Sequence, residues 1–195
     1  MATVLDVAEM IVELAPSVRT DWTKLQKLVF YAQAWSLAWD GQPLFEDPIE
    51  AWKNGPASPR VYAKQRYEDC VFNGQIRTLT PDAVETIKAV VAAYGEKPGS
   101  WLSELAHRER PWIAARSGLP STARGNTVIT HDSMRNWYGQ FPLERKKFTP
   151  EFMRGLDALV ETPLEEVDLL FEKPIDGSAY VRWLAEGDAA WPEGS

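Results

Sequence analysis

The sequence predicts a mainly α-helical fold, with a few short β-strands, built around one central buried helix. Two observations support this prediction. Several segments repeat apolar residues at helical spacing, and each follows a Ser, Thr or Asp that can cap a helix. Residues 24–40 are apolar on two faces rather than one, which is typical of a helix enclosed by others. We therefore expect a compact helical domain with a C-terminal helical extension.

The first two helices are delimited by capping and breaking residues. Residues 4–14 place apolar side chains at helical spacing, and Pro16 ends that helix. Thr20 or Asp21 caps the next helix, which breaks at Gly41. This second helix is the predicted centre of the fold.

Lys24, Lys27 and Tyr31 form the one polar strip on that central helix, each about one turn from the next. Two interpretations remain open. The strip is either a solvated edge, with lysine stems lying over apolar neighbours, or a recognition strip that contacts a partner.

A short strand or hairpin arm is predicted over residues 45–52 and is followed by a turn on Asn54, Gly55 and Pro56. Pro56 excludes a central strand beyond the turn. Ser58 is predicted to cap a third helix. Pro59 follows it at the first helical position, where the missing N–H of proline costs nothing.

The later elements follow from the same signals. A second short strand is expected over residues 75–79, and a brief extended piece over 127–129. Residues 118–126 are expected to form an exposed loop. Capping residues and apolar spacing predict the remaining helices over 80–95, 99–110, 130–138, 149–160, 162–170 and 178–185.

Composition is that of a soluble globular protein, with 45% hydrophobic and 25% charged residues among 195. The single Cys70 cannot form an internal disulfide, which fits a reducing compartment. Residues 1–16 carry no basic residue ahead of their apolar positions, and the apolar run 28–39 is too short to span a bilayer. We therefore expect a cytoplasmic protein with no membrane partner.

The net charge of −7 is concentrated near the C-terminus. Residues 151–195 contain 11 acidic and 3 basic residues, whereas residues 1–150 contain 17 and 18. No basic face for phosphates is apparent, so we expect no direct nucleic-acid binding. The acidic segment serves either solubility or the docking of a basic protein.

Catalytic patterns are sparse. Cys70, His107 and His131 are too few for a zinc site without carboxylates, and the surroundings of Cys70 are typical of a helix end. Glu104 and His107 are spaced i, i+3, but the carboxylate-bridged metal sites that use this spacing need a second such pair. We therefore predict a binding protein rather than an enzyme, with no cofactor and no metal.

Three stretches resemble one known family. Residues 24–62 read KLQKLVFYAQAWSLAWDGQPLFEDPIEAWKNGPASPRVY, residues 104–107 read ELAH, and Pro111 and Trp112 follow. Together with the weaker stretch 129–138, they are similar to the Panacea domain, the SocA-like antitoxin family also seen in many phage-associated proteins. The resemblance spans roughly residues 4–140.

The resemblance departs from the family at two positions. Asn54 stands where the family often has an aromatic residue, and Ala106 replaces a frequent Thr. We therefore expect a Panacea-like domain over residues 1–141 and an acidic helical extension over 142–195, which either packs on that domain or binds a partner.

The resemblance implies an antitoxin that neutralises a cognate toxin by direct binding in a hetero-complex. The turn after residue 52 fixes its backbone with Gly and Pro and so displays aromatic side chains at little entropic cost. Alternatively, Trp52 and Tyr62 are core residues that anchor the fold and do not contact a partner. The residues predicted to contact the partner are Lys27, Tyr31, Trp52, Asn54, Gly55, Pro56, Tyr62 and His107.

Other functions remain open at this point. Some relatives resemble proteolytic adaptors, which would add an ATP-dependent protease as a partner and give the acidic segment a docking role. A small metal-dependent hydrolase using Glu104 and His107, or a phage accessory protein, are further alternatives. Self-association is left open.

Overall fold

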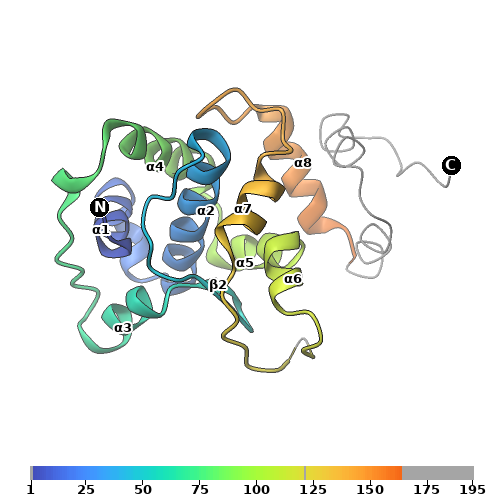
Figure 1. Ribbon diagram of the computed structural model, residues 1–195, viewed down its shortest axis with the longest axis horizontal. Helices are drawn as coiled ribbons and strands as arrows, with labels where there is room; N and C mark the ends of the chain where they lie inside the picture. The colour runs from blue at the N-terminus through green and yellow to red at the C-terminus, as the bar shows by residue number, and fades with distance from the viewer. Residues whose placement is uncertain (1, 121, 164–195) are drawn as a thin grey trace, which may run out of the picture.

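A computed structural model describes residues 2–120 and 122–163. This part of the chain is mainly helical, with one small two-stranded sheet, as the sequence predicts. Helix α2 runs through the middle of the molecule and the other helices surround it (Figure 1). The elements are α1 (Val4–Leu14), η1 (Pro16–Arg19), α2 (Trp22–Asp40), β1 (Glu50–Trp52), β2 (Gly55–Ala57), α3 (Pro59–Tyr67), η2 (Ile76–Thr78), α4 (Pro81–Tyr94), α5 (Gly99–His107), α6 (Arg110–Ala115), α7 (His131–Tyr138) and α8 (Pro150–Glu161).

Side-chain caps start most of these helices where the sequence predicts. The Asp21 carboxylate accepts from the backbone N–H of Lys24 and so starts α2. Gly41 ends the same helix in the left-handed conformation, with φ of 67°. Such caps satisfy backbone groups that would otherwise lack partners. The corresponding N-caps of α3, α4, α7 and α8 are Ser58, Thr80, Thr130 and Thr149.

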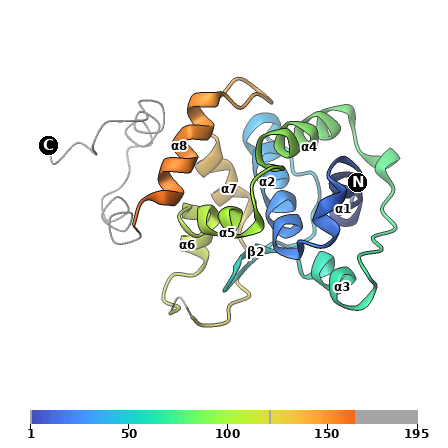
Figure 2. The same cartoon turned by 180° about the vertical axis from the view of Figure 1, so that it is seen from behind.

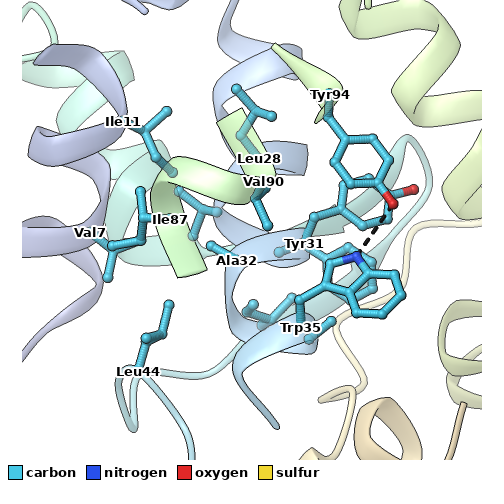
Figure 3. Close-up of a cluster of buried hydrophobic side chains, with 14 of the residues drawn as sticks. Val7, Ile11, Leu28, Tyr31, Ala32, Trp35, Leu44, Ile87, Val90 and Tyr94 are labelled. Carbon is cyan, nitrogen blue, oxygen red and sulfur yellow. Dashed lines mark hydrogen bonds between the residues drawn. The ribbon is translucent and has the colours of Figure 1, made fainter. Parts of the chain in front are cut away.

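The core forms where α1, α4, α5 and α7 pack on α2. Figure 3 shows side chains of α1, α2 and α4 meeting on one side of this core, where the indole of Trp35 donates to the Tyr94 hydroxyl at 3.3 Å. Tyr31 stacks on Tyr94 with ring centroids 4.7 Å apart. Both faces of α2 are therefore covered, which confirms the predicted central buried helix.

The sheet is a hairpin in which β1 pairs antiparallel with β2. A third extended segment, residues 127–129, lies alongside β1. The N–H of Ala51 donates to Thr127 O at 2.8 Å, and the N–H of Ile129 donates to Ile49 O at 2.8 Å. The extended piece predicted there is present.

The strand predicted over residues 75–79 is wrong. Residues Ile76–Thr78 form the single 3₁₀ turn η2. The N–H of Gln75 donates to the Asp6 carboxylate of α1 at 2.5 Å, and Gly74 lies directly against the α1 backbone. Contacts with a helix distant in the sequence therefore fix this segment, and within residues 2–120 and 122–163 no strand pairs with it.

The described part of the C-terminal extension packs against the helical body. Phe148 and Phe152 contact Trp35 of the core edge to face, at 5.0 and 5.9 Å between ring centroids. Helix α8 lies beside α5, on the opposite side of the molecule from α1 (Figures 1 and 2). The helices predicted over 162–170 and 178–185 fall almost entirely outside the described residues. Within the described residues, no helix is long and apolar enough to cross a membrane.

Candidate functional site

The hairpin formed by β1 and β2 lies in the lower part of Figure 1. Trp52 pairs with Gly55, so Lys53 and Asn54 form the two-residue loop, and Gly55 and Pro56 belong to β2 rather than to the turn. The loop therefore lies slightly earlier than the predicted turn on residues 54–56. Gly55 has φ of 94°, a conformation that residues with side chains rarely adopt.

Side chains of α5, α6 and the residue after α6 donate hydrogen bonds to the backbone of this hairpin. The Trp112 indole donates to Trp52 O at 2.9 Å, and the Ser103 hydroxyl donates to Asn54 O at 2.9 Å. Arg116 Nη1 donates to Ala51 O at 3.0 Å. Both arms of the hairpin loop are thus fixed by side chains from elsewhere in the chain.

Lys27 of α2 ends directly beneath the hairpin. It is only 2% exposed, and its ammonium donates to Pro56 O at 3.0 Å. Burial lowers the pKa of Lys27 to about 7, because removal from water disfavours the charged form. A Cβ at Gly55 would lie 2.7 Å from Lys27 Cε, so the absence of a side chain at Gly55 makes room for the lysine.

His107, at the end of α5, lies close to the same point. Its Nε2 would be 3.5 Å from a Cβ at Gly55, is buried, and has no hydrogen-bond partner among the described residues. Burial, and then the charge of Lys27, lower the pKa of His107 to about 4. The imidazole, which packs on Trp112 at 4.3 Å between ring centroids, is therefore neutral near pH 7.

A small pocket of about 160 Å³ opens between α2, the hairpin and α3. Trp52 and Tyr62 form one wall and meet edge to face at 5.1 Å between ring centroids. Trp22 and Tyr62 are 38% and 37% exposed at its rim. The lining residues are Trp22, Thr23, Gln26, Lys27, Trp52, Asn54, Gly55, Ala57, Tyr62 and Gln65.

Paired amides stiffen the floor of this hairpin pocket. Gln26 Nε2 donates to Gln65 Oε1 at 2.9 Å, and Gln26 Oε1 accepts from the N–H of Ser58 at 2.8 Å. Gln65 in turn donates to Trp22 O at 3.2 Å. These buried bonds tie α2 to α3, so the two helices present the pocket as a rigid unit.

Most of the residues predicted to bind a partner gather here. Lys27, Trp52, Asn54, Gly55 and Tyr62 line the hairpin pocket. Pro56 and His107 lie next to the pocket. Pro56 O accepts a hydrogen bond from Lys27, and His107 lies close to Gly55.

Tyr31 lies apart from the pocket. Its ring is fully buried between α2, α4 and α7, and its hydroxyl donates to Glu109 Oε2 at 3.0 Å. The interpretation of Lys27 and Tyr31 as a solvated edge is wrong, because both side chains are buried.

Sequence reasoning missed two groups. Trp22, Gln26 and Gln65 line the pocket, and the i, i+4 spacing of Trp22 and Gln26 before Lys27 is the signal that could have indicated them. Glu109 has a buried carboxyl group that accepts hydrogen bonds from the hydroxyls of Tyr31 and Tyr138. Burial raises its pKa to about 8, and no local pattern marks it.

The residues considered for catalysis do not converge. Glu104 pairs with Arg108 at 2.8 Å, and the buried Cys70 thiol, whose pKa burial raises, lies 3.5 Å from Arg19 O. His131, the first residue of α7, contacts Gln33 and does not line the hairpin pocket. Over residues 2–120 and 122–163, no group of three or more His, Cys, Asp or Glu side chains could hold a metal ion.

Residues 25–113 match the family model described as "Antitoxin SocA-like, Panacea domain". This stretch is therefore similar to the Panacea domain. It begins in α2, includes the hairpin, and ends in α6, so it contains the whole lining of the pocket except Trp22 and Thr23. The match is shorter than the predicted span of residues 1–141. No curated protein and no solved structure matches the chain. The match to this family supports an antitoxin-type role.

Proposed function

We propose that this protein is the antitoxin of a toxin–antitoxin pair and that it neutralises its toxin by direct, stoichiometric binding. The observation that carries the proposal is the hairpin pocket, a rigid aromatic-walled surface formed mostly by residues that match the Panacea family. The antitoxin-type role of the family supplies the class of partner, a toxin protein.

The hairpin pocket has the properties of a protein-binding surface. Tryptophan and tyrosine are enriched among the residues that dominate binding energy, and Trp22, Trp52 and Tyr62 surround this opening. Three side-chain hydrogen bonds already order the hairpin, so little conformational entropy is lost when a partner binds. The surface is therefore suited to cover part of a toxin.

Co-expression tests the proposal. The open reading frame next to the gene for this protein is expressed alone and together with it, and growth is followed. We expect the neighbour to stop growth alone, growth to be restored by this protein, and the two to co-purify as a complex. A neighbour that is neither toxic nor bound by this protein would contradict the proposal.

A second candidate function is that of a proteolytic adaptor, favoured by the acidic segment 151–195. An adaptor would bind the toxin in the same way and then deliver it to an ATP-dependent protease. The half-life of the toxin in cells with and without the protease separates the two mechanisms. Direct neutralisation leaves that half-life unchanged, whereas delivery shortens it only where the protease is present.

A further inference from the structure

An ammonium without a counter-ion lines the hairpin pocket. Lys27 forms no ion pair with any described residue, and the one acceptor found for it is the carbonyl of Pro56. An ammonium carries three donors, and buried charges in proteins are normally paired. Lys27 therefore lacks an acidic partner with which it could form an ion pair.

The size of the pocket restricts what can enter it. At about 160 Å³ it is well below the roughly 300–1,000 Å³ typical of sites for cofactors and other small molecules. A single amino-acid side chain fits. The rings of Trp52 and Tyr62 supply apolar surface for an aliphatic stem, and Lys27 supplies a point charge for a carboxylate.

Exposed cations lie on α3 and on the hairpin loop, two of the elements that form this opening. Helix α3 carries Arg60, Lys64 and Arg66 and no acidic residue. Arg60 and Lys64 pair with Asp47 and Glu68, whereas Arg66, and Lys53 of the hairpin loop, are exposed and pair with no described residue. The Glu50 carboxylate bonds the Trp52 indole at 2.6 Å. Local positive charge on a chain of net charge −7 favours an acidic partner segment.

We infer that the hairpin pocket receives the carboxylate side chain of a Glu or Asp from an acidic segment of the partner protein, and that Lys27 pairs with it. This inference rests on the proposed function, since the partner is the toxin. Arg66 and Lys53 attract the acidic segment, and the aromatic walls hold the stem of the inserted side chain. The buried pair then slows dissociation.

A titration without the toxin tests the pocket directly. N-acetyl-glutamate N-methylamide, and as its neutral counterpart N-acetyl-glutamine N-methylamide, are added to the isotope-labelled protein and followed by NMR. The glutamate compound is expected to shift the signals of Trp52, Gly55 and the Lys27 side chain and to raise the pKa of Lys27, because a paired ammonium keeps its proton. Equal shifts with both compounds, or stronger binding of inorganic phosphate, would overturn the inference.

Variants separate the role of Lys27 from general charge effects. Lys27→Met removes the ammonium and is expected to weaken binding of the glutamate compound at least about tenfold. Lys88→Met, on the exposed face of α4, is the matched control and should bind as the wild type does. Lys27→Gln serves the same purpose should the methionine variant fail to fold. Unchanged binding by a folded Lys27 variant would overturn the inference.

Neutralisation of the toxin separates the carboxylate pairing from the proposed function. If the toxin is neutralised by the wild type and equally well by folded Lys27→Met, the carboxylate pairing is wrong while the proposed function stands. If the glutamate compound binds as expected but no toxin is found, the proposed function is wrong while the pocket chemistry stands. Loss of neutralisation in Lys27→Met together with the NMR result supports both.

Discussion

Gly55 and Lys27 constrain each other at the centre of the site. Gly55 adopts a φ of 94° and lies so close to Lys27 that a Cβ there would come within 2.7 Å of the lysine Cε. The glycine is therefore required for two separate reasons, its backbone conformation and the space it leaves for the lysine.

Gly55→Ala should destabilise the protein through both effects. The left-handed conformation alone costs on the order of 1–3 kcal/mol for a residue with a side chain, and the contact with Lys27 adds to this. Gly118→Ala is the matched control, because Gly118 has φ of 83° but open space around it. Urea unfolding should show the larger loss of unfolding free energy for Gly55→Ala. Equal losses would show that the contact with Lys27 carries no cost.

Glu109 should make stability fall as the pH rises. Burial raises its folded pKa from 4.5 to about 8, so between these values the folded state binds the proton more often than the unfolded state does. The stabilisation that this group contributes is fully present below pH 4.5. It is lost as the pH rises to about 8, at up to about 1.4 kcal/mol per pH unit. Glu109→Gln mimics the protonated form and accepts from the same hydroxyls.

The unfolding free energies of wild type and Glu109→Gln should therefore diverge between pH 5 and pH 8, with the variant losing less. Glu104→Gln, at an exposed position, should follow the wild type. A constant difference between wild type and Glu109→Gln across this range would contradict the assignment of Glu109 as a buried neutral acid.

At the scale of the elements, Arg116 connects α6 to both the hairpin and the loop after α6. Its guanidinium donates to Ala51 O, Pro120 O and Ala123 O at 3.0, 3.0 and 2.8 Å. Residues 118–126, predicted to form an exposed loop, are therefore fixed by hydrogen bonds to the guanidinium of Arg116. A lysine cannot reach three carbonyls in this way.

Arg116→Lys should leave buried carbonyls without donors and cost about 1–3 kcal/mol. Amide hydrogen exchange should quicken in residues 117–127 and in β1. Arg154→Lys, on the exposed face of α8, should change neither the stability nor the exchange. Exchange that remains unchanged in Arg116→Lys would mean that other contacts hold the loop.

Trp52→Ala tests whether Trp52 is a binding residue or a core anchor. We expect partner binding to weaken by at least about 2 kcal/mol, roughly 30-fold, because the residue forms a wall of the pocket. Trp101→Ala removes a half-buried tryptophan of α5 outside the pocket and should bind normally. Circular dichroism establishes whether each variant folds. Loss of folding in Trp52→Ala would show that Trp52 acts as a core anchor.

Local sequence signals predicted the helices well. Asp21, Ser58, Thr80, Thr130 and Thr149 all cap where expected, because capping depends on residues within one turn. The two apolar faces of α2 correctly indicated a buried helix. The short segment η2 could not be predicted, because Asp6, about 70 positions earlier in the chain, supplies its anchoring acceptor.

The site was predicted in part. The glycine and proline of the hairpin marked its place, and five of the proposed binding residues line its pocket. Helical spacing located Lys27 and Tyr31 on one face of α2 but could not show what covers that face. Tyr31 is buried by α4 and α7, whereas Lys27 reaches the hairpin.

At the scale of the whole molecule, the helical body positions the hairpin pocket at one edge. Helix α8, which forms the start of the acidic segment 151–195, lies on the side opposite α1 and α3 (Figures 1 and 2). Among the described residues, none of those that line the pocket belongs to α8. This arrangement fits the proposed neutralisation by the part of the chain that matches the Panacea family.

The most direct test adds the purified protein in increasing molar ratio to the purified toxin, with no protease present, and measures the activity of the toxin. Direct neutralisation predicts that activity falls in proportion to the amount added and is abolished near one equivalent. Full toxin activity in the presence of excess protein would contradict the account.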